Sequence, residues 1–445
     1  MDAVHSQVDE MSCDASQCPP SSPAATTTTT TAATTFNQPN SQRVSVDHLP
    51  KLGELSDDGQ TSWHERAGWR FIRSCTPAWF TVNMGTGIVG ILLQTLPYNG
   101  RWLYWISIIF FVLNVVLFVI FVVTSALRYT LYPGLWSTTL RHPVVPLFLG
   151  AFPIALSTII EMMILVCGPA WGQWAIIFAW ALWWIDIVVS IAICYGVPFY
   201  IMYAQDIQLS NVTAAWLLPG ASVIVAAGVG GVVAEALENT QHALWTLLVS
   251  YFLWGTAMPI SVSLMVIYLH RLFVHKLPPR EVIVSSLLPV AALGQGGFGI
   301  LQFGKVAMEV FPQNGIFATP SNSAGQVLYT IGWLISILMW SYGSFWLAIA
   351  IMSMARGRFA FNLSWWSFTF PLGVWASTAV AFGEEMPSTF FKVFGTVVSI
   401  IVTLLWVVVA LGTLRGVING TIFAAPDFEA WRKSRNNKPE IIEKV

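Results

Sequence analysis

The sequence predicts an all-α membrane protein with ten transmembrane helices. Of its 445 residues, 55% are hydrophobic and only 10% are charged, whereas a soluble domain carries roughly a quarter charged residues. Its apolar runs repeatedly reach about 20 residues, the length at which a helix crosses the hydrocarbon of a bilayer. The 22 Trp and 28 Phe suit the aromatic belts found at membrane interfaces. No soluble fold could bury this much apolar surface.

Ten apolar runs, separated by polar or turn-forming residues, are the expected spans. They lie at residues 74–95, 102–126, 144–167, 173–198, 213–236, 243–269, 282–304, 326–354, 365–383 and 389–414. An even number of spans places both termini on one side. All but three of the 21 lysines and arginines then lie on that side, the exceptions being Arg101, Lys305 and Lys392. Because cytoplasmic segments retain positive charge, both termini are expected in the cytoplasm.

The chain divides into three parts. Residues 1–65 are rich in Ser, Thr and Pro, a composition that cannot bury enough apolar area to offset chain entropy, so a disordered cytoplasmic tail is expected. Residues 70–415 form the ten-helix domain, and residues 416–445 form a polar cytoplasmic C-terminal tail. The five cysteines follow neither a disulfide framework nor a metal-binding spacing.

Proline and glycine concentrate in the odd-numbered spans. A proline removes a backbone hydrogen bond and kinks a helix, and in lipid the freed carbonyl must face protein or a water-filled cavity. The pattern therefore suggests five helical hairpins, with the odd helices around a central pore and the even helices outside. The alternative is that these residues simply mark close helix packing. The expected helix kinks are at Pro77, Pro153, Pro219, Pro289 and Pro371.

No pattern of a chemical active site is present in the spans. There is no P-loop, no cluster of His and Cys ligands and no nucleophile elbow. The formal net charge of −1 provides no global field for nucleic acid. The protein is therefore expected not to be an enzyme, to need no cofactor or metal, and to have the lipid bilayer rather than nucleic acid as its surroundings.

Several motifs resemble those of the tellurite-resistance/dicarboxylate transporter family. The segment 76–90, TPAWFTVNMGTGIVG, looks like the opening span of that family, which includes plant slow anion channels, fungal malate permeases and fungal sulfite efflux pumps. Three further stretches match its fungal members: AAWLLP at 214–219, LGQGGFG at 293–299 and WWSFTFP at 365–371. The second of these and the pattern of the fifth span look more like sulfite pumps than malate permeases.

The resemblance implies a ten-helix fold of five hairpins in a pseudo-fivefold arrangement, usually assembled as a homotrimer with one pore per subunit. It further implies a multi-pass plasma-membrane anion transporter, which we expect to export sulfite or bisulfite. The main alternative is proton-coupled transport of malate or another C4-dicarboxylate on the same fold. A receptor or scaffold without transport is a second alternative, which the broken odd helices and the small tails disfavour.

The resemblance also implies an aromatic plug on the ninth span, because a phenylalanine there blocks the pore in channel members. The matching position is Phe370, and its neighbour Phe368 stays open as the alternative. The substrate would be a small inorganic or organic anion, which a buried full positive charge would bind too tightly for fast release. Weaker polar partners are expected instead, with local packing as the alternative role of each: Asn83, Thr86, Gly87, Ser222, Gln295 and Thr369.

Two acidic residues lie within spans, where an unpaired charge is costly. Asp186 lies near the middle of the fourth span and Glu161 in the outer half of the third. One interpretation is a proton relay coupled to anion movement, and the other is a hydrogen-bonded acid that joins adjacent helices. On the outer side, several glutamates make the mouth of the pore acidic, which would disfavour re-entry of anions: Glu235, Glu238, Glu384 and Glu385.

Overall fold

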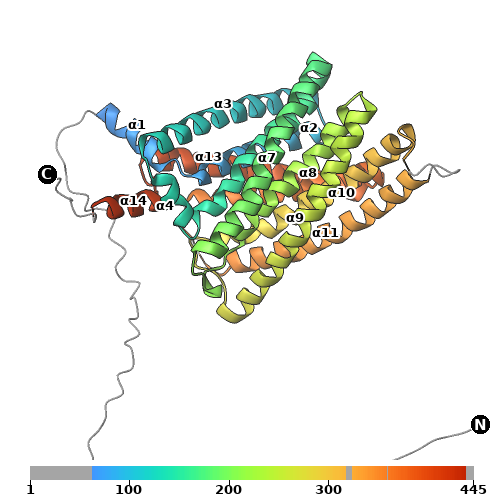
Figure 1. The fold of residues 1–445 in the computed structure, drawn as a ribbon. Coiled ribbons are helices and arrows are strands. Elements are labelled where there is room, and N and C mark those ends of the chain that lie inside the picture. The colour runs from blue at the N-terminus through green and yellow to red at the C-terminus, as the bar shows by residue number, and fades with distance from the viewer. Residues whose placement is uncertain (1–62, 317–322, 358, 437–445) are drawn as a thin grey trace, which may run out of the picture. The chain divides into compact units, whose positions relative to one another are not determined.

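The structure, a computed structural model, describes residues 63–316, 323–357 and 359–436. The expected N-terminal tail lies outside these ranges, apart from its last three residues, which begin helix α1 (Trp63–Ser74). In the described ranges all regular secondary structure is helical. Figure 1 shows the long helices lying side by side along one common direction, so this part of the chain is a helical bundle.

Five units of the bundle each consist of a short 3₁₀ helix that runs directly into an α-helix. We call these units the core segments. They are η1 (Pro77–Trp79) with α2 (Phe80–Thr95), η2 (Val145–Gly150) with α5 (Ala151–Met162), η5 (Ala214–Leu217) with α8 (Leu218–Ala236), η6 (Ile283–Leu287) with α10 (Leu288–Gln313), and η7 (Leu363–Phe368) with α12 (Thr369–Glu385). Each of the five odd-numbered spans predicted from the sequence is thus interrupted near its start.

A long, unbroken α-helix follows each core segment along the chain, and we call these five the cover helices. They are α3 (Arg101–Leu131), α7 (Gln173–Ala204), α9 (Thr240–His275), α11 (Ala324–Met354) and α13 (Thr389–Ile418). Prolines occur inside two of them, as Pro198 in α7 and Pro259 in α9, without ending the helix. Both positions are visible in the sequence: Pro259 makes the sixth predicted span the exception to the proline pattern, and Pro198 ends the fourth predicted span.

Eight helical stretches in the described residues are long and apolar enough to cross a membrane, which confirms a polytopic membrane protein. They comprise the five cover helices and the stretches Val145–Trp171, Ala214–Ala236 and Ile283–Gln313. In their most apolar windows, 17–33% of cover-helix residues are buried, against 78–100% in these three stretches. Surface that meets lipid must be apolar, whereas a helix enclosed by protein can carry polar residues. The two remaining core segments, containing α2 and α12, are not among these eight stretches, and their helices carry several Gly and Thr residues.

The core segments contact one another in an order that closes on itself. Helix α2 packs against α5, α5 against α8, α8 against α10, α10 against α12, and α12 against α2. Each of these helices also packs against the cover helix that follows it in the chain. The cover helices therefore separate the core segments from the surroundings, which explains why nearly every residue of α8 and most residues of α10 are buried.

Glycines bring the core helices close together. A Cβ added at Gly294 of α10 would lie 2.9 Å from the backbone nitrogen of Trp375 in α12. A Cβ on Gly299 would lie 3.1 Å from the Cα of Gly228 in α8. Because a backbone atom cannot move aside as a flexible side chain can, only glycine permits these two approaches. Most of the glycines identified in the odd spans thus serve helix packing.

Shorter helices lie at the ends of the bundle. Helix α5 continues through a π-helical turn, η3 (Met163–Cys167), into α6 (Gly168–Trp171), and η4 (Leu209–Asn211) precedes the third core segment. Helix α4 (Leu135–Arg141) follows α3 and contacts α14 (Pro426–Asn436), which is formed by the C-terminal residues. Figure 1 shows α4 and α14 next to each other at one end of the bundle. Part of the expected C-terminal tail is therefore an ordered helix.

Candidate functional site

All five core helices meet around one cavity of about 200 Å³ near their C-terminal ends. We call this cavity, with the residues that line it, the vestibule. Its lining comprises Ile91 and Thr95 from α2, Glu161 and Leu165 from α5 and η3, Val232 and Glu235 from α8, Phe298, Leu301, Gln302 and Lys305 from α10, and Ser377, Val380, Ala381, Glu384 and Glu385 from α12. A solute that moves between the core helices would enter or leave through this space.

Charged side chains cross the vestibule and join three core helices. The Lys305 Nζ lies 3.2 Å from Glu235 Oε1 and 3.8 Å from Glu385 Oε1. The second oxygen of Glu235 accepts a hydrogen bond from the Gln302 amide, and that of Glu385 accepts one from the Tyr329 hydroxyl. The expected acidic mouth thus contains three of the four glutamates named for it, together with one lysine. Glu238 lines a neighbouring cavity instead.

Glu161 differs from the other acidic residues of the vestibule. It is only 8% exposed, and its carboxyl group has no hydrogen-bond or ion-pair partner among the described residues. Buried polar groups nearly always have a partner. Water or a solute in the cavity can therefore act as the partner of Glu161.

One polar side chain continues the vestibule toward the middle of the bundle. Gln295 precedes Gln302 by seven residues, about two helical turns, and so lies on the same side of α10. Its amide, 4% exposed, lies against Gly228 of α8, where an added Cβ would come within 2.7 Å of the Gln295 Nε2. No hydrogen-bond partner of this amide is found in the described part of the chain. Its two N–H donors thus have no protein acceptor in the described residues.

The two candidate gate residues lie in different surroundings. Phe370, which is 2% exposed, precedes Ser377 and Glu384 of the vestibule by about two and four turns and so shares their side of α12. Phe368 belongs to the 3₁₀ helix η7, and its ring packs against the rings of Phe359 and Trp365, 6.4 and 5.5 Å away. Phe370 therefore lies on the vestibule side of α12, whereas Phe368 lies in η7 before that helix begins.

The expected hydroxyl partners are already used within their own helices. Thr86 donates to the carbonyl of Val82, Ser222 to that of Pro219, and Thr369 to that of Trp366. In addition, the Thr86 oxygen accepts a hydrogen bond from Trp406 of α13. In this conformation, these three side chains have packing and local hydrogen-bonding roles.

Asn83 and Gly87 belong to a polar contact between α2, α3 and α5. The Asn83 amide donates to the backbone and side-chain oxygens of Asn114, both at 2.9 Å, and Asn114 donates to Thr158. A Cβ at Gly87 would lie 2.1 Å from the Thr158 Oγ1. Gly87 thus lets α2 approach this group, and one acceptor, Asn83 Oδ1, has no partner.

Asp186 and Glu161 lie near the same stretch of α5. Asp186, in the cover helix α7 and fully buried, accepts a short hydrogen bond of 2.5 Å from the Ser157 hydroxyl. Its other oxygen has no partner within the described ranges. Ser157 precedes Glu161 by four residues, about one helical turn. Ser157, the hydrogen-bond partner of Asp186, thus lies on the same face of α5 as Glu161.

The prolines of the core segments stand at the junction between the 3₁₀ and α parts. Pro77 lies in the first turn of η1, Pro219 in that of α8 and Pro289 in that of α10. Pro153 and Pro371 are the third residues of α5 and α12. Pro77 begins η1 after an extended residue, so it sacrifices no hydrogen bond. The other four prolines follow a 3₁₀ turn directly and cannot donate to a carbonyl of that turn. The interruption thus precedes each core α-helix instead of kinking its middle.

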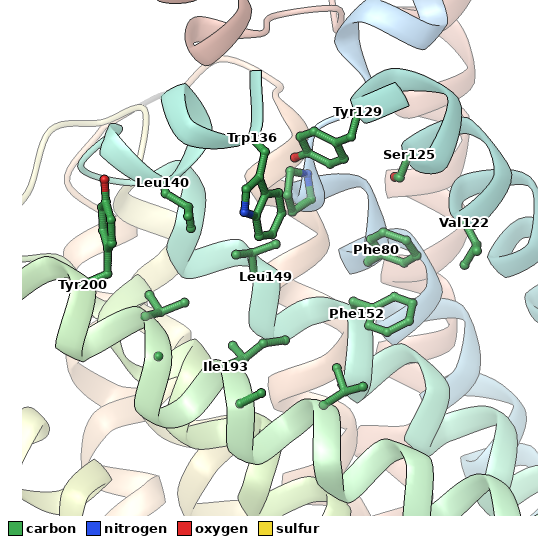
Figure 2. Close-up of a pocket in the computed structure, with 15 residues that line it drawn as sticks. Phe80, Val122, Ser125, Tyr129, Trp136, Leu140, Leu149, Phe152, Ile193 and Tyr200 are labelled. Atoms are coloured by element: carbon green, nitrogen blue, oxygen red, sulfur yellow. The ribbon is translucent and has the colours of Figure 1, made fainter. Parts of the chain in front are cut away.

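A larger cavity, of about 520 Å³, lies apart from the vestibule. Its walls come from η1 and α2, α3, α4, η2 and α5, and α7. Figure 2 shows the rings of Phe80 and Phe152 together on one side of it and Tyr200 on the other. The lining is almost wholly apolar and contains no charged residue. Since an anion loses its hydration there without replacement, this cavity is not an anion site.

The sequence profile of the SLAC1 family, described as voltage-dependent anion channels, matches residues 74–414. This range begins just before the first core segment and ends inside the last cover helix. The chain belongs to this family. As a SLAC1-family member it is a membrane transporter and not an enzyme, in agreement with the absence of catalytic motifs noted in its sequence.

Named relatives cover most of the chain. The sulfite efflux pump SSU1 of Arthroderma benhamiae is 49% identical over 345 residues, which are 78% of this chain and 91% of the relative. The Candida albicans pump of the same name is 26% identical, with 79% and 77% of the two chains covered. The malic acid transport protein of Schizosaccharomyces pombe is 23% identical, with 85% and 89% covered.

Several residues at the site did not emerge from sequence reasoning. Ser157, Asn114 and Gln302 are ordinary polar residues in apolar runs, and their partners lie on other helices. Helical spacing could have identified Gln302 and Lys305. They follow Gln295 by seven and ten residues, so all three lie on about the same side of α10.

Proposed function

We propose that this protein exports sulfite or bisulfite across the plasma membrane. The observation that carries the proposal is the 49% identity to a sulfite efflux pump across 91% of that pump's length. The geometry supports it, since the five core helices converge on a polar vestibule and the unpartnered Gln295 amide lies farther inside. The substrate is a small oxyanion that accepts hydrogen bonds from such N–H groups.

The distribution of charge suits passage of an anion rather than its retention. Lys305 is the one lysine or arginine on the five core segments, all of which lie in the described ranges. An anion between these helices meets weak amide donors first and a full positive charge only at the vestibule. Conduction requires binding that is weak enough to allow release. An anion with one or two charges therefore passes without a deep energy minimum in the middle of the bundle.

We also propose the number and arrangement of spans that the sequence predicted. The eight long apolar stretches, together with the core segments containing α2 and α12, make ten spans in five hairpins with pseudo-fivefold symmetry around the passage. The closed order of contacts among the core helices supports this arrangement. We further propose a homotrimer with one passage per subunit, flanked by cytoplasmic tails at residues 1–65 and 416–445.

We also propose a path for protons that move with the anion. Asp186 and Glu161 would exchange a proton through Ser157, whose hydroxyl is already bonded to Asp186. Glu161 would exchange it with the vestibule, which it lines. The other role open to Asp186 is that of a hydrogen-bonded acid joining α7 to α5.

The alternative, transport of malate, has weaker support. The relative named for malic acid transport is only 23% identical. A C4-dicarboxylate is also larger than sulfite and would need two sets of donors, whereas the passage has the single amide of Gln295 below the vestibule. We therefore favour sulfite over malate as the transported substrate.

Purified protein in liposomes is expected to transport radiolabelled sulfite much faster than malate, because the passage offers one small set of anion partners. Initial rates at equal concentration and equal membrane potential give the comparison, and empty liposomes give the background. Faster malate transport with sulfite flux at background would reverse the assignment.

Topology provides a separate prediction. Epitope tags at both ends of the chain should be reached by antibody only after the plasma membrane is permeabilised, since the positive-inside rule places both tails in the cytoplasm. A tag inserted after Asn314, between α10 and α11, should be reached in intact cells and serves as the matched control. Labelling of either tail in intact cells would contradict the ten-span arrangement.

A further inference from the structure

Lys305 is the single basic residue of the core segments, and the vestibule holds it between two competing carboxylates. Its side chain is 38% exposed, while those of Glu235 and Glu385 are 44% and 20% exposed. An ammonium group has three N–H donors. Glu235 and Glu385 approach it at 3.2 and 3.8 Å from α8 and α12. One N–H of Lys305 therefore remains for a third partner. A closer contact between an anion and Lys305 requires that Glu235 or Glu385 move away.

Two further kinds of group bear on what the cavity can bind. Glu161 lines it and is more than nine-tenths buried, with no partner among the described residues. The Gln302 amide, which bonds Glu235 through one N–H, has a second N–H donor. Glu384 also lines the cavity. Lys305 and Gln302 can thus donate hydrogen bonds to an oxyanion, while the glutamates compete with it.

We infer that the vestibule is the last binding site of the transported oxyanion on the side opposite the termini. Lys305 binds the anion there, and Glu235 and Glu385 compete with the anion for Lys305. This inference rests on the proposed function, which supplies the substrate class and the direction.

Because of this competition, the protein binds its substrate less readily from the vestibule side than from the other side. An anion that arrives from the vestibule side must displace a carboxylate and approach a cavity with four glutamates and one lysine. An anion that arrives from the other side reaches the amide of Gln295 first. Nearby charges of like sign lower the local concentration of an approaching ion. The half-saturation concentration for external sulfite is therefore higher than that for internal sulfite, while the driving force is unchanged.

Uptake and efflux of radiolabelled sulfite test the inference in cells that lack other sulfite transport, at neutral pH and with flux normalised to surface protein. Lys305→Gln is expected to raise the half-saturation concentration for external sulfite about two- to fivefold, the range expected for partly exposed ion pairs. Glu235→Gln combined with Glu385→Gln is expected to lower it by a similar factor. Both differences should shrink at high ionic strength, because salt screens exposed charges.

One variant serves as the control. Glu281→Gln removes an exposed acid just before η6, at the opposite end of that core segment, and should change nothing. An unchanged half-saturation concentration in Lys305→Gln, or in the double glutamate variant, would overturn the inference. If the wild type carries no sulfite, the proposed function fails, and the same variants measured with malate decide the role of the vestibule.

Discussion

Replacing Asp427 by alanine is expected to destabilise the described domain by about 3–5 kcal/mol, the usual cost of leaving one charge of a buried pair without its partner. Asp427 in α14 accepts two hydrogen bonds from the Arg128 guanidinium in α3, at 2.8 and 2.9 Å, and both side chains are fully buried. Thr139 of α4 donates a third hydrogen bond to the same carboxylate. The variant leaves the Arg128 charge buried without a counter-charge, so α14 is expected to leave its site.

The measurements are the melting temperature in detergent and the rate of proteolysis within α14. Glu429→Ala, which removes an exposed acid from the same helix, is the matched control and should lie within about 0.5 kcal/mol of wild type. Arg128→Met combined with Asp427→Leu should recover most of the loss, because well-packed apolar residues often replace a buried ion pair. A single Asp427→Ala variant as stable as the control would show that α14 contributes little to the fold.

Phe370→Ala is expected to raise anion flux per folded molecule. A bulky ring on the vestibule side of α12 can close a narrow passage that alanine leaves open, and the ring offers an anion no hydrogen bond, so its effect is steric and hydrophobic. Flux of sulfite into liposomes, or basal anion current, normalised to folded protein, measures the change. The oligomer should stay intact.

A pure packing role for Phe370 has the opposite consequence. The cavity left by alanine would then cost about 3–5 kcal/mol and lower both yield and flux. Phe368→Ala is the matched comparison, because that ring packs against Phe359 and Trp365. Increased flux in Phe368→Ala alone would assign the gate to Phe368. Decreased flux in both variants would remove the aromatic gate from this protein.

Hydropathy predicted the extents of several helices closely, both for an enclosed core segment and for a cover helix. The expected spans 213–236 and 326–354 compare with helical stretches Ala214–Ala236 and Ala324–Met354. Cover helices extend farther than expected, as α9 runs from Thr240 to His275 against a prediction of 243–269. The additional turns carry polar residues such as His270 and Arg271, which a hydropathy window excludes although they continue the helix.

The contacts between helices could not be predicted, since they depend on the rotation of each helix about its axis. Arg128 and Asp427 lie 299 positions apart, and Asp427 belongs to a segment whose composition predicted only a polar tail. Asp186 was identified as costly in a span, but its partner Ser157 is one of many serines. Residue type alone also could not separate the unpartnered amide of Gln295 from the hydroxyl of Ser222, which bonds its own helix.

The order of core segments and cover helices also orients the electric field along the proposed passage. Each cover helix brings the chain back to the end of the bundle where the preceding core helix began. All five core helices therefore start at the same end. Their peptide dipoles are then aligned, with partial positive charge at the starting end and partial negative charge at the vestibule. An anion is attracted at the end where it would enter from the cytoplasm. Lys305, near the end of α10, offsets the unfavourable potential where the anion would leave.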